Sequence, residues 1–382
     1  MAVEPFSIHF SQHAVDDLRD RLAGMRWPDE VAASSWDYGF NLQSLQEICG
    51  YWQNQFDWKQ QVETLATLHH YRYLSDGPGI HFIYERGRGP APIPLVMTHG
   101  WPGSFLEMIR ILPLLTDPAA HGADPVDSFD VVVPSLPGYG FSDRPGGGIN
   151  TFRIAELWAA LMLELGYPRF AAQGGDIGAG VATILGLRHA SRIFGMHLNY
   201  IPGSYRPSLA GKTKLVASEE EFLESAGRWY EQSYAYGHVQ ATRPQTAAYG
   251  LNDSPAGLAA WILEKFRAWS DCDGDLYRRF TRDELLTNVT LYWMTETIYS
   301  SFRLYYEGRK APLHFGPDDF VHVPCAIARF PKEEPFPPRE WIERGYNVQR
   351  WTEMPRGGHF AAAEEPELLA EDIRAFFRQF RR

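Results

Sequence analysis

The sequence predicts an α/β fold in which helices cover both faces of a mostly parallel sheet. Short apolar runs of strand length alternate with helical periodicity after about residue 80, and the alternation returns near the C-terminus. The length of 382 residues suits one large α/β domain with insertions, or two to three ordinary domains. Hydrophobic residues make up 45% of the chain and aromatic residues 14%, which is enough for a substantial core and excludes general disorder.

Charge and cysteine content restrict the partners and the compartment. The net charge of −11 gives an acidic surface that repels phosphate groups, so neither nucleic acid nor an anionic membrane is an expected partner. Residues 1–17 lack the basic start and the apolar run of a signal peptide, and no stretch of about 18 apolar residues predicts a membrane span. The three cysteines, Cys49, Cys272 and Cys325, form no CxxC pair, which favours a reducing compartment. We therefore expect a soluble, cytoplasmic protein.

Residues 1–90 are expected to form an N-terminal region that packs on the core. Ser11 is the expected N-cap of a first helix, and a second apolar stripe recurs at helical spacing near residue 50. A two-helix unit of this length has little core of its own, so both helices must dock on another part of the chain. Their apolar residues are Val15, Leu18, Leu22 and Met25 in the first helix, and Leu45, Ile48, Trp52 and Phe56 in the second.

The α/β core is expected in two parts, residues 91–202 and 313–382, separated by an inserted helical cap over residues 203–312. The alternation stops in the insertion, where the aromatic-rich segments 259–269 and 285–306 have helical periodicity. It resumes afterwards and ends with a helix that has one apolar face. The expected strands cover residues 80–85, 93–98, 129–134, 169–173, 194–201, 321–330 and 347–354, and two expected core helices cover residues 151–165 and 178–189. The last expected helix has Glu364, Glu365 and Glu367 near its N-terminal end and an apolar face formed by Leu369, Ile373, Phe376, Phe377 and Phe380.

Asp176 stands at the centre of the segment Gly174-Gly175-Asp176-Ile177-Gly178, between an expected strand and an expected helix. Small residues on either side fit a tight strand–turn–helix elbow, which presents its central side chain at the carboxyl end of the sheet. In esterases the central residue is serine, and no G-x-S-x-G occurs in this chain. A carboxylate at that position can attack a saturated carbon that carries a leaving group. Taken alone, the pattern fits a helix-capping aspartate equally well.

Two further strand ends carry candidate partners of Asp176. His359 follows the last expected strand, and a histidine there can deprotonate the water that cleaves an alkyl ester. Glu333 and its neighbour Glu334 follow the preceding expected strand, so either can supply the acid that orients the histidine. The chain order of nucleophile, acid and histidine is the one known for elbows of this kind. Taken singly, a histidine after a strand is more often structural.

The segment His99-Gly100-Trp101-Pro102 follows the strand that supplies the second oxyanion donor in such folds. The backbone N–H groups of Trp101 and Ile177 are therefore the expected oxyanion hole. We expect His99 itself to be a buried structural residue.

No metal or organic cofactor is expected. His69 and His70 lack a third ligand at metal-binding spacing. Gly87-Arg88-Gly89 does not predict a nucleotide site, because Pro90 follows where a helix should begin.

Five motifs in the right order give the chain a resemblance to epoxide hydrolases of the α/β-hydrolase fold, in the branch related to the microsomal and juvenile-hormone enzymes. The resemblance covers essentially the whole chain and implies a parallel sheet with a helical cap insertion and an N-terminal extension. The motifs are Arg26-Trp27-Pro28-Asp29 with Trp36-Asp37-Tyr38-Gly39, His99-Gly100-Trp101-Pro102, Gly174-Gly175-Asp176-Ile177-Gly178, Phe330-Pro331-Lys332-Glu333 and Arg356-Gly357-Gly358-His359-Phe360.

The resemblance also implies a role for each candidate residue. Asp176 resembles the family nucleophile, His359 the base and Glu333 the acid. Two cap tyrosines of the family donate hydrogen bonds to the epoxide oxygen, and the matching segments 236–240 and 300–305 give Tyr236 and Tyr305. Their neighbours Tyr234 and Tyr306 are close competitors for these two roles.

The implied activity is hydrolysis of a small hydrophobic epoxide to a vicinal diol without a cofactor. The microsomal relatives carry an N-terminal membrane anchor and this chain starts after it, so the resemblance implies a soluble enzyme. Relatives are often homodimers. One alternative is a haloalkane dehalogenase, although the Trp that usually follows its nucleophile is replaced here by Ile177. The other alternative is a non-catalytic ligand receptor of the same fold, which need not retain Asp176, Glu333 and His359 together.

Overall fold

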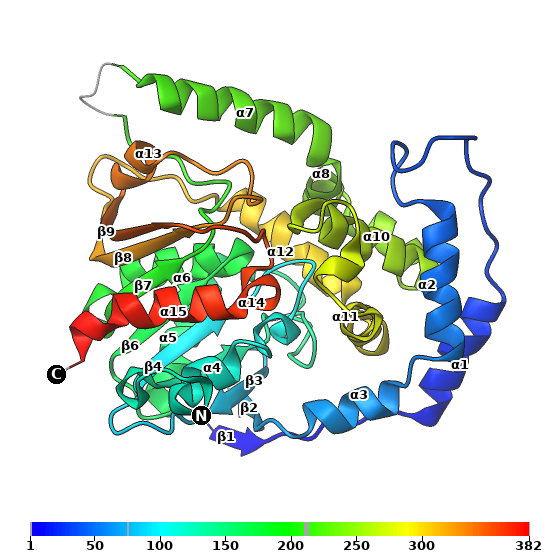
Figure 1. The fold of residues 1–382 in the computed structure, drawn as a ribbon, viewed down its shortest axis with the longest axis horizontal. Helices are drawn as coiled ribbons and strands as arrows, with labels where there is room; N and C mark the ends of the chain where they lie inside the picture. The colour runs from blue at the N-terminus through cyan, green and yellow to red at the C-terminus, as the bar shows by residue number, and fades with distance from the viewer. Residues whose placement is uncertain (1, 75, 210–213, 382) are drawn as a thin grey trace.

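The computed structural model describes residues 2–74, 76–209 and 214–381. Within these residues a nine-stranded sheet has the order β1-β2-β3-β5-β4-β6-β7-β8-β9, and helices lie on both of its faces (Figure 1). The strands are β1 (Ala2–Pro5), β2 (His70–Leu74), β3 (Ile80–Glu85), β4 (Ile93–Thr98), β5 (Phe129–Pro134), β6 (Phe170–Gly174), β7 (Ile193–Leu198), β8 (Val321–Arg329) and β9 (Tyr346–Glu353).

The pairing of the strands divides the sheet into an antiparallel and a parallel part. The strands β1, β2, β3 and β5 pair antiparallel, whereas every pair from β5 through β4, β6, β7 and β8 to β9 is parallel. Strand β5 is buried along its whole length, as expected of a strand covered on both faces. The mostly parallel sheet with helices on both faces that the sequence predicts is therefore confirmed.

The core helices pack on the parallel strands. Helices α5 and α6 contact one another, and α4 contacts α15, so that one pair lies on each face of the sheet (Figure 1). Six short 3-10 helices connect the elements in the described residues. The core helices are α4 (Leu112–Thr116), α5 (Thr151–Glu164), α6 (Asp176–Arg188), α13 (Arg339–Glu343), α14 (Ala361–Glu364) and α15 (Pro366–Phe377), and the 3-10 helices are η1 (Phe105–Met108), η2 (Pro118–His121), η3 (Pro125–Asp127), η4 (Ala190–Arg192), η5 (Leu276–Arg278) and η6 (Arg378–Phe380).

In the described residues, six α-helices between β7 and β8 form the cap. They are α7 (Ala217–Ser233), α8 (Ala235–Thr242), α9 (Pro244–Leu251), α10 (Pro255–Trp269), α11 (Arg282–Thr295) and α12 (Ile298–Lys310). The segment 285–306 is helical, as expected, but in two parts, because Glu296 has a φ of +52° and separates α11 from α12. The expected cap includes residues 210–213, which lie outside the described part of the chain.

The N-terminal helices dock mainly on the cap. Ser11 caps α1 (Gln12–Ala23) by accepting a hydrogen bond from the backbone N of Ala14, as expected. The next two helices are α2 (Leu42–Asn54) and α3 (Trp58–Leu65). The indole N–H of Trp52 on α2 donates to the hydroxyl of Thr290 on α11 at 2.8 Å, and both side chains are buried. Strands β1 and β2 meanwhile extend the sheet, so this region joins the cap to the core.

Candidate active site

Asp176 lies in a strained turn between β6 and α6. Its φ of +45° is in the left-handed region, which a residue with a Cβ adopts only when the surrounding structure enforces it. Two glycines make the turn possible: a Cβ on Gly174 would collide with the backbone of Gly178, and one on Gly178 would collide with the carbonyl of Thr98. The expected strand–turn–helix elbow is present, and Asp176 sits at the carboxyl end of the parallel strands.

The two carboxylate oxygens of Asp176 have different neighbours. The backbone N–H of Trp101 donates to Oδ1 at 2.8 Å, and Nε2 of His359 lies 3.7 Å from Oδ2. Ile177 follows Asp176 in the first turn of α6. Of the two backbone groups expected as oxyanion donors, the N–H of Trp101 therefore contacts the carboxylate directly, and that of Ile177 belongs to the elbow itself.

His359 is held between two carboxylates. Its Nδ1 lies 2.7 Å from Oε2 of Glu333, whereas Glu334 is exposed. The His359 side chain is 9% exposed and that of Glu333 is 6% exposed. Burial opposes the charged imidazolium, but the carboxylates of Glu333 and Asp176 outweigh burial and raise the pKa of His359 to about 10. The structure therefore brings together the three residues that the sequence singled out and distinguishes Glu333 from its neighbour.

Tyr236 on α8 and Tyr305 on α12 face the same site from the cap. Their rings lie 6.2 Å apart, and the indole of Trp101 stacks on Tyr236 at 5.1 Å and meets Tyr305 edge-on at 6.0 Å. Burial raises the pKa of both phenols well above its ordinary value. Both hydroxyls therefore stay protonated at neutral pH and can donate hydrogen bonds.

The competing tyrosines have different surroundings. Tyr306 is 38% exposed and packs under the ammonium group of Lys310 at 4.1 Å. Tyr234 lines the same cavity as Tyr236, but its ring stacks on that of Tyr230 at 4.6 Å.

A large cavity lies between the cap and the carboxyl end of the sheet. Its volume is about 1410 Å³, and its wall includes Asp176, His359, Tyr236 and Tyr305. The rest of the lining includes many apolar and aromatic side chains of the cap, such as Leu223. The cavity therefore combines apolar and aromatic surface, as a site for a small organic molecule does, with polar and charged side chains that include Asp176 and His359.

A second, much smaller cavity adjoins Asp176 and His359 on the core side. Its volume of about 10 Å³ is close to the space that one water molecule needs. The lining includes Glu107 of η1 and Asn199, and burial raises the pKa of Glu107 to about 8. Sequence reasoning missed Glu107, although an acidic residue within the apolar segment 105–108 was a usable signal.

His99 belongs to the scaffold. It is buried, its Nε2 accepts a hydrogen bond from the backbone N–H of Leu136, and its Nδ1 lies 3.0 Å from the carbonyl of Gly100. Burial lowers the pKa of His99 to about 4, so the ring is neutral. This geometry agrees with the structural role expected for it.

No group of three or more His, Cys, Asp or Glu side chains in the described ranges is arranged to hold a metal ion. None of the helices described there is both long and apolar enough to cross a membrane.

The chain matches two family models and full-length relatives. Residues 3–108 match the model described as the epoxide hydrolase N terminus, and residues 93–281 match that of the α/β hydrolase fold. The chain is 43% identical over 381 residues to a putative epoxide hydrolase of Stigmatella aurantiaca, with 99% of this chain and 86% of the relative covered. It is 40% identical over 402 residues to epoxide hydrolase 1 of Oryctolagus cuniculus, with 98% and 88% covered.

A solved structure agrees with these matches. The crystal structure of juvenile hormone epoxide hydrolase from the silkworm Bombyx mori superimposes with a TM-score of 0.84 at 32% sequence identity, and the match covers 100% of this chain and 94% of that one. Identity of this level over nearly the whole length, together with the elbow, the cap and the N-terminal region, identifies the family. The chain belongs to the epoxide hydrolases of the α/β-hydrolase fold and is a hydrolase.

Proposed function

We propose that the protein converts an epoxide to a vicinal diol through a covalent ester on Asp176. The observation that carries this proposal is the arrangement around one cavity: a carboxylate, a His359–Glu333 pair beside it, and two protonated tyrosine hydroxyls opposite. The apolar and aromatic side chains in the cavity wall support a small hydrophobic epoxide as the substrate. Activity towards styrene oxide tests the proposal.

The first step is alkylation of Asp176. A carboxylate oxygen attacks one ring carbon, a C–O bond forms, and the bond between that carbon and the epoxide oxygen breaks. Tyr236 and Tyr305 donate hydrogen bonds to the leaving oxygen, and one of the two hydroxyls passes its proton to the alkoxide as it forms, which leaves a phenolate. Their raised pKa values keep both phenols in the donating form before the reaction.

The second step is hydrolysis of the ester. His359 takes a proton from water, and the resulting hydroxide attacks the carboxyl carbon of Asp176. The bond between that carbon and the alkyl oxygen then breaks, the departing oxygen takes the proton of the former hydroxide to complete the diol, and Asp176 is a carboxylate again. The proton on His359 returns to the phenolate formed in the first step. The backbone N–H groups of Trp101 and Ile177 stabilise the oxyanion, and Glu333 orients the imidazole and stabilises its charge. Esterification also removes the negative charge of Asp176, which is one of the causes of the raised pKa of His359. The chemistry of the first step therefore prepares the base for the second.

Ester hydrolysis should become faster as the pH rises, whereas alkylation should stay nearly constant around neutral pH. The pKa of His359 is about 10 in the free enzyme and must be lower in the ester, where Asp176 is neutral. The neutral, basic form of His359 therefore increases as the pH rises through that lower value. Rapid-quench measurement of both steps over a pH series checks this. Hydrolysis that slows with rising pH would exclude His359 as the base.

Glu333→Gln should slow ester hydrolysis strongly, while Glu334→Gln leaves it close to the wild-type rate. Glu333 contacts Nδ1 of His359 at 2.7 Å, whereas Glu334 is exposed. The loss of the orienting carboxylate in a comparable triad costs up to ~10⁴-fold. Single-turnover kinetics of the two matched variants measure the difference, and the reverse ranking would move the acid role to Glu334.

Two other activities are tested in the same assay. A haloalkane dehalogenase would need donors for the departing halide, and the Ile177 side chain beside the nucleophile offers none. A ligand receptor of this fold would bind without turnover. Incubation with styrene oxide and with a haloalkane, side by side, separates the three: diol from the epoxide alone supports the proposal, whereas halide release alone or no product at all contradicts it.

A further inference from the structure

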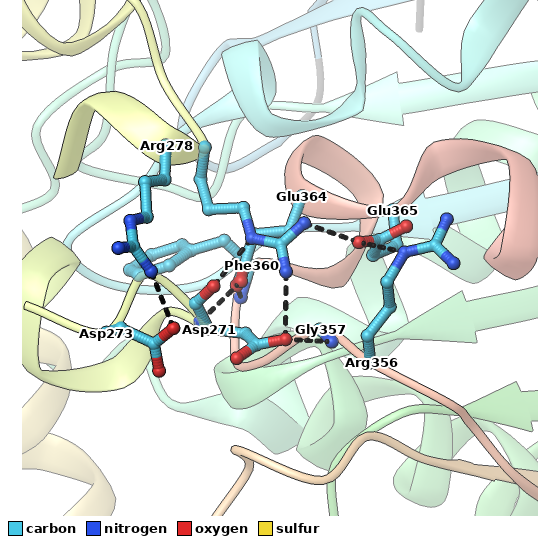
Figure 2. Close-up of polar contacts among 9 residues, drawn as sticks. Asp271, Asp273, Arg278, Arg356, Gly357, Phe360, Glu364 and Glu365 are labelled. Carbon is cyan, nitrogen blue, oxygen red and sulfur yellow. Dashed lines mark hydrogen bonds and ion pairs between the residues drawn. The ribbon is translucent and has the colours of Figure 1, made fainter. Parts of the chain in front are cut away.

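The loop that carries His359 is tied to the cap. This loop (residues 354–360, the base loop) connects β9 to α14. The backbone N–H of Gly357 donates to the carboxylate of Asp271 at 2.9 Å, and that of His359 donates to the carbonyl of Trp269 at 3.0 Å. Both acceptors belong to the cap, since Trp269 ends α10 and Asp271 lies two residues further on. Figure 2 shows Asp271 beside Gly357.

Glu364 joins the same two segments from the core side. It lies at the end of α14 and is 7% exposed. One carboxylate oxygen accepts a hydrogen bond from the backbone N–H of Phe360 at 3.0 Å, and the other accepts from that of Asp271 at 2.7 Å (Figure 2). Each oxygen thus serves one backbone group, the first next to His359 and the second in the cap.

Three more charged residues complete the connection: Arg279, Arg356 and Glu365. Arg279 of the cap donates to Oδ2 of Asp271 at 2.8 Å and to Oε1 of Glu365 at 2.6 Å. Arg356 in the base loop donates to the same Glu365 oxygen at 2.8 Å (Figure 2). Asp271, Arg279, Glu364 and Glu365 are called the clamp below. The clamp residues lie in the cap and at the end of α14, and they contact Arg356, Gly357 and Phe360, so the base loop is held from both sides.

Aromatic packing also joins the side chains of the base loop to α10 of the cap. The ring of Phe266 on α10 stacks on that of Phe360 with centroids 4.1 Å apart, and the indole of Trp269 lies 5.0 Å from the imidazole of His359. A Cβ on Gly358 would press against the carbonyl of Trp269. The base loop and the cap therefore meet too closely for one to move independently of the other.

We propose that the clamp positions His359 for ester hydrolysis, with Glu364 and Asp271 as its principal positioning residues. This inference rests on the proposed function, in which His359 acts as a base only after the ester has formed. Glu333 fixes one end of the imidazole, and the clamp fixes the main chain on both sides of it. A misplacement of about 1 Å in a reacting group can cost ~10²-fold in rate. Loss of the clamp should therefore slow the second step and spare the first.

Glu364→Gln tests the inference with little change in shape. An amide has only one acceptor oxygen, so one of the two backbone N–H groups loses its partner. We expect ester hydrolysis to slow by about tenfold or more, alkylation to stay close to the wild-type rate, and the ester to accumulate. Glu367→Gln, at an exposed position in the first turn of α15, is the matched control and should behave like the wild type. Asp271→Ala should likewise slow ester hydrolysis and leave alkylation unchanged. If Glu364→Gln does not fold, the Asp271→Ala variant provides the test of the clamp.

Rapid-quench measurement of both steps separates positioning from general damage. A loss of structure would reduce alkylation and hydrolysis together, and that result, or unchanged hydrolysis, would overturn the inference. The His359→Gln variant, measured in the same experiment, distinguishes a failure of the proposed function from a failure of the proposed role of the clamp. If it fails to accumulate the ester, the proposed function is wrong. If it does accumulate the ester while the Glu364 and Asp271 variants hydrolyse normally, only the role of the clamp is wrong.

Discussion

The His359→Gln variant should form the ester on Asp176 at close to the wild-type rate and then hydrolyse it very slowly. Glutamine cannot take a proton from water, so the second step loses its general base, which contributes about 10²–10⁴-fold in such reactions. A protein species heavier by the mass of one substrate molecule should accumulate. Intact-protein mass spectrometry after mixing with excess styrene oxide detects it.

A surface histidine provides the control for this variant. His322 lies on β8 with an exposed side chain, and His322→Gln should turn over like the wild type without an accumulated ester. Turnover of His359→Gln at the wild-type rate would mean that another group is the base.

Replacement of both Tyr236 and Tyr305 by Phe should nearly abolish alkylation. Each change removes one hydroxyl and keeps the bulk of the ring. Loss of one oxyanion-type donor costs roughly 10²–10³-fold, although two donors that share the charge can each cost less when removed singly. Hydrolysis of any ester that does form should stay nearly normal, because the alkoxide develops only during ring opening. Rapid-quench kinetics of the single and double variants measure both steps.

The neighbouring tyrosines are the matched controls. Tyr306→Phe changes a ring at the protein surface and should leave alkylation unaffected. Tyr234→Phe changes a ring that lines the cavity and stacks on Tyr230, so it tests whether a hydroxyl at this position contributes. Unimpaired alkylation in the Tyr236/Tyr305 double variant would move the donor role to Tyr234 or Tyr306.

The cap contacts the candidate active site in two places. Tyr236 and Tyr305 reach the cavity from α8 and α12, whereas Asp271 and Trp269 hold the base loop from the far end of α10. The tyrosines are proposed to act on the first step and the clamp on the second. Substitutions in the cap should accordingly separate into two groups by the step that they slow.

Secondary structure is predicted best from the sequence where a run of apolar residues or a glycine-rich turn marks the element clearly. Strands β3, β4 and β5 have the bounds expected from their apolar runs, and β6 and α6 meet at the expected elbow. Strands β1 and β2 were not predicted, because they are short and partly exposed and therefore lack a clear alternation of apolar and polar residues. Glu296 was missed as a helix end because its left-handed conformation interrupts an otherwise helical pattern, and glutamate is not a typical residue for such a position.

Contacts between distant parts of the chain could not be predicted from the sequence. The clamp joins Asp271 to Glu364, which are 93 residues apart, and the pattern around each of them is that of an ordinary acidic loop or helix end. Glu107 likewise lies at the site because the fold packs η1 beside Asp176, where Glu107 lines the small cavity. Such groupings depend on how the cap and the base loop are packed in three dimensions.

A single turnover in H₂¹⁸O tests the covalent mechanism most directly. With enzyme in excess over styrene oxide, the account predicts that one ¹⁸O atom enters the carboxylate of Asp176, because water attacks the carboxyl carbon of the ester. The first diol then carries the unlabelled oxygen that Asp176 gave up. Mass spectrometry of the peptide that contains Asp176 and of the diol measures both. Label in the first diol and none in Asp176 would show that water attacks the epoxide directly, which contradicts the account.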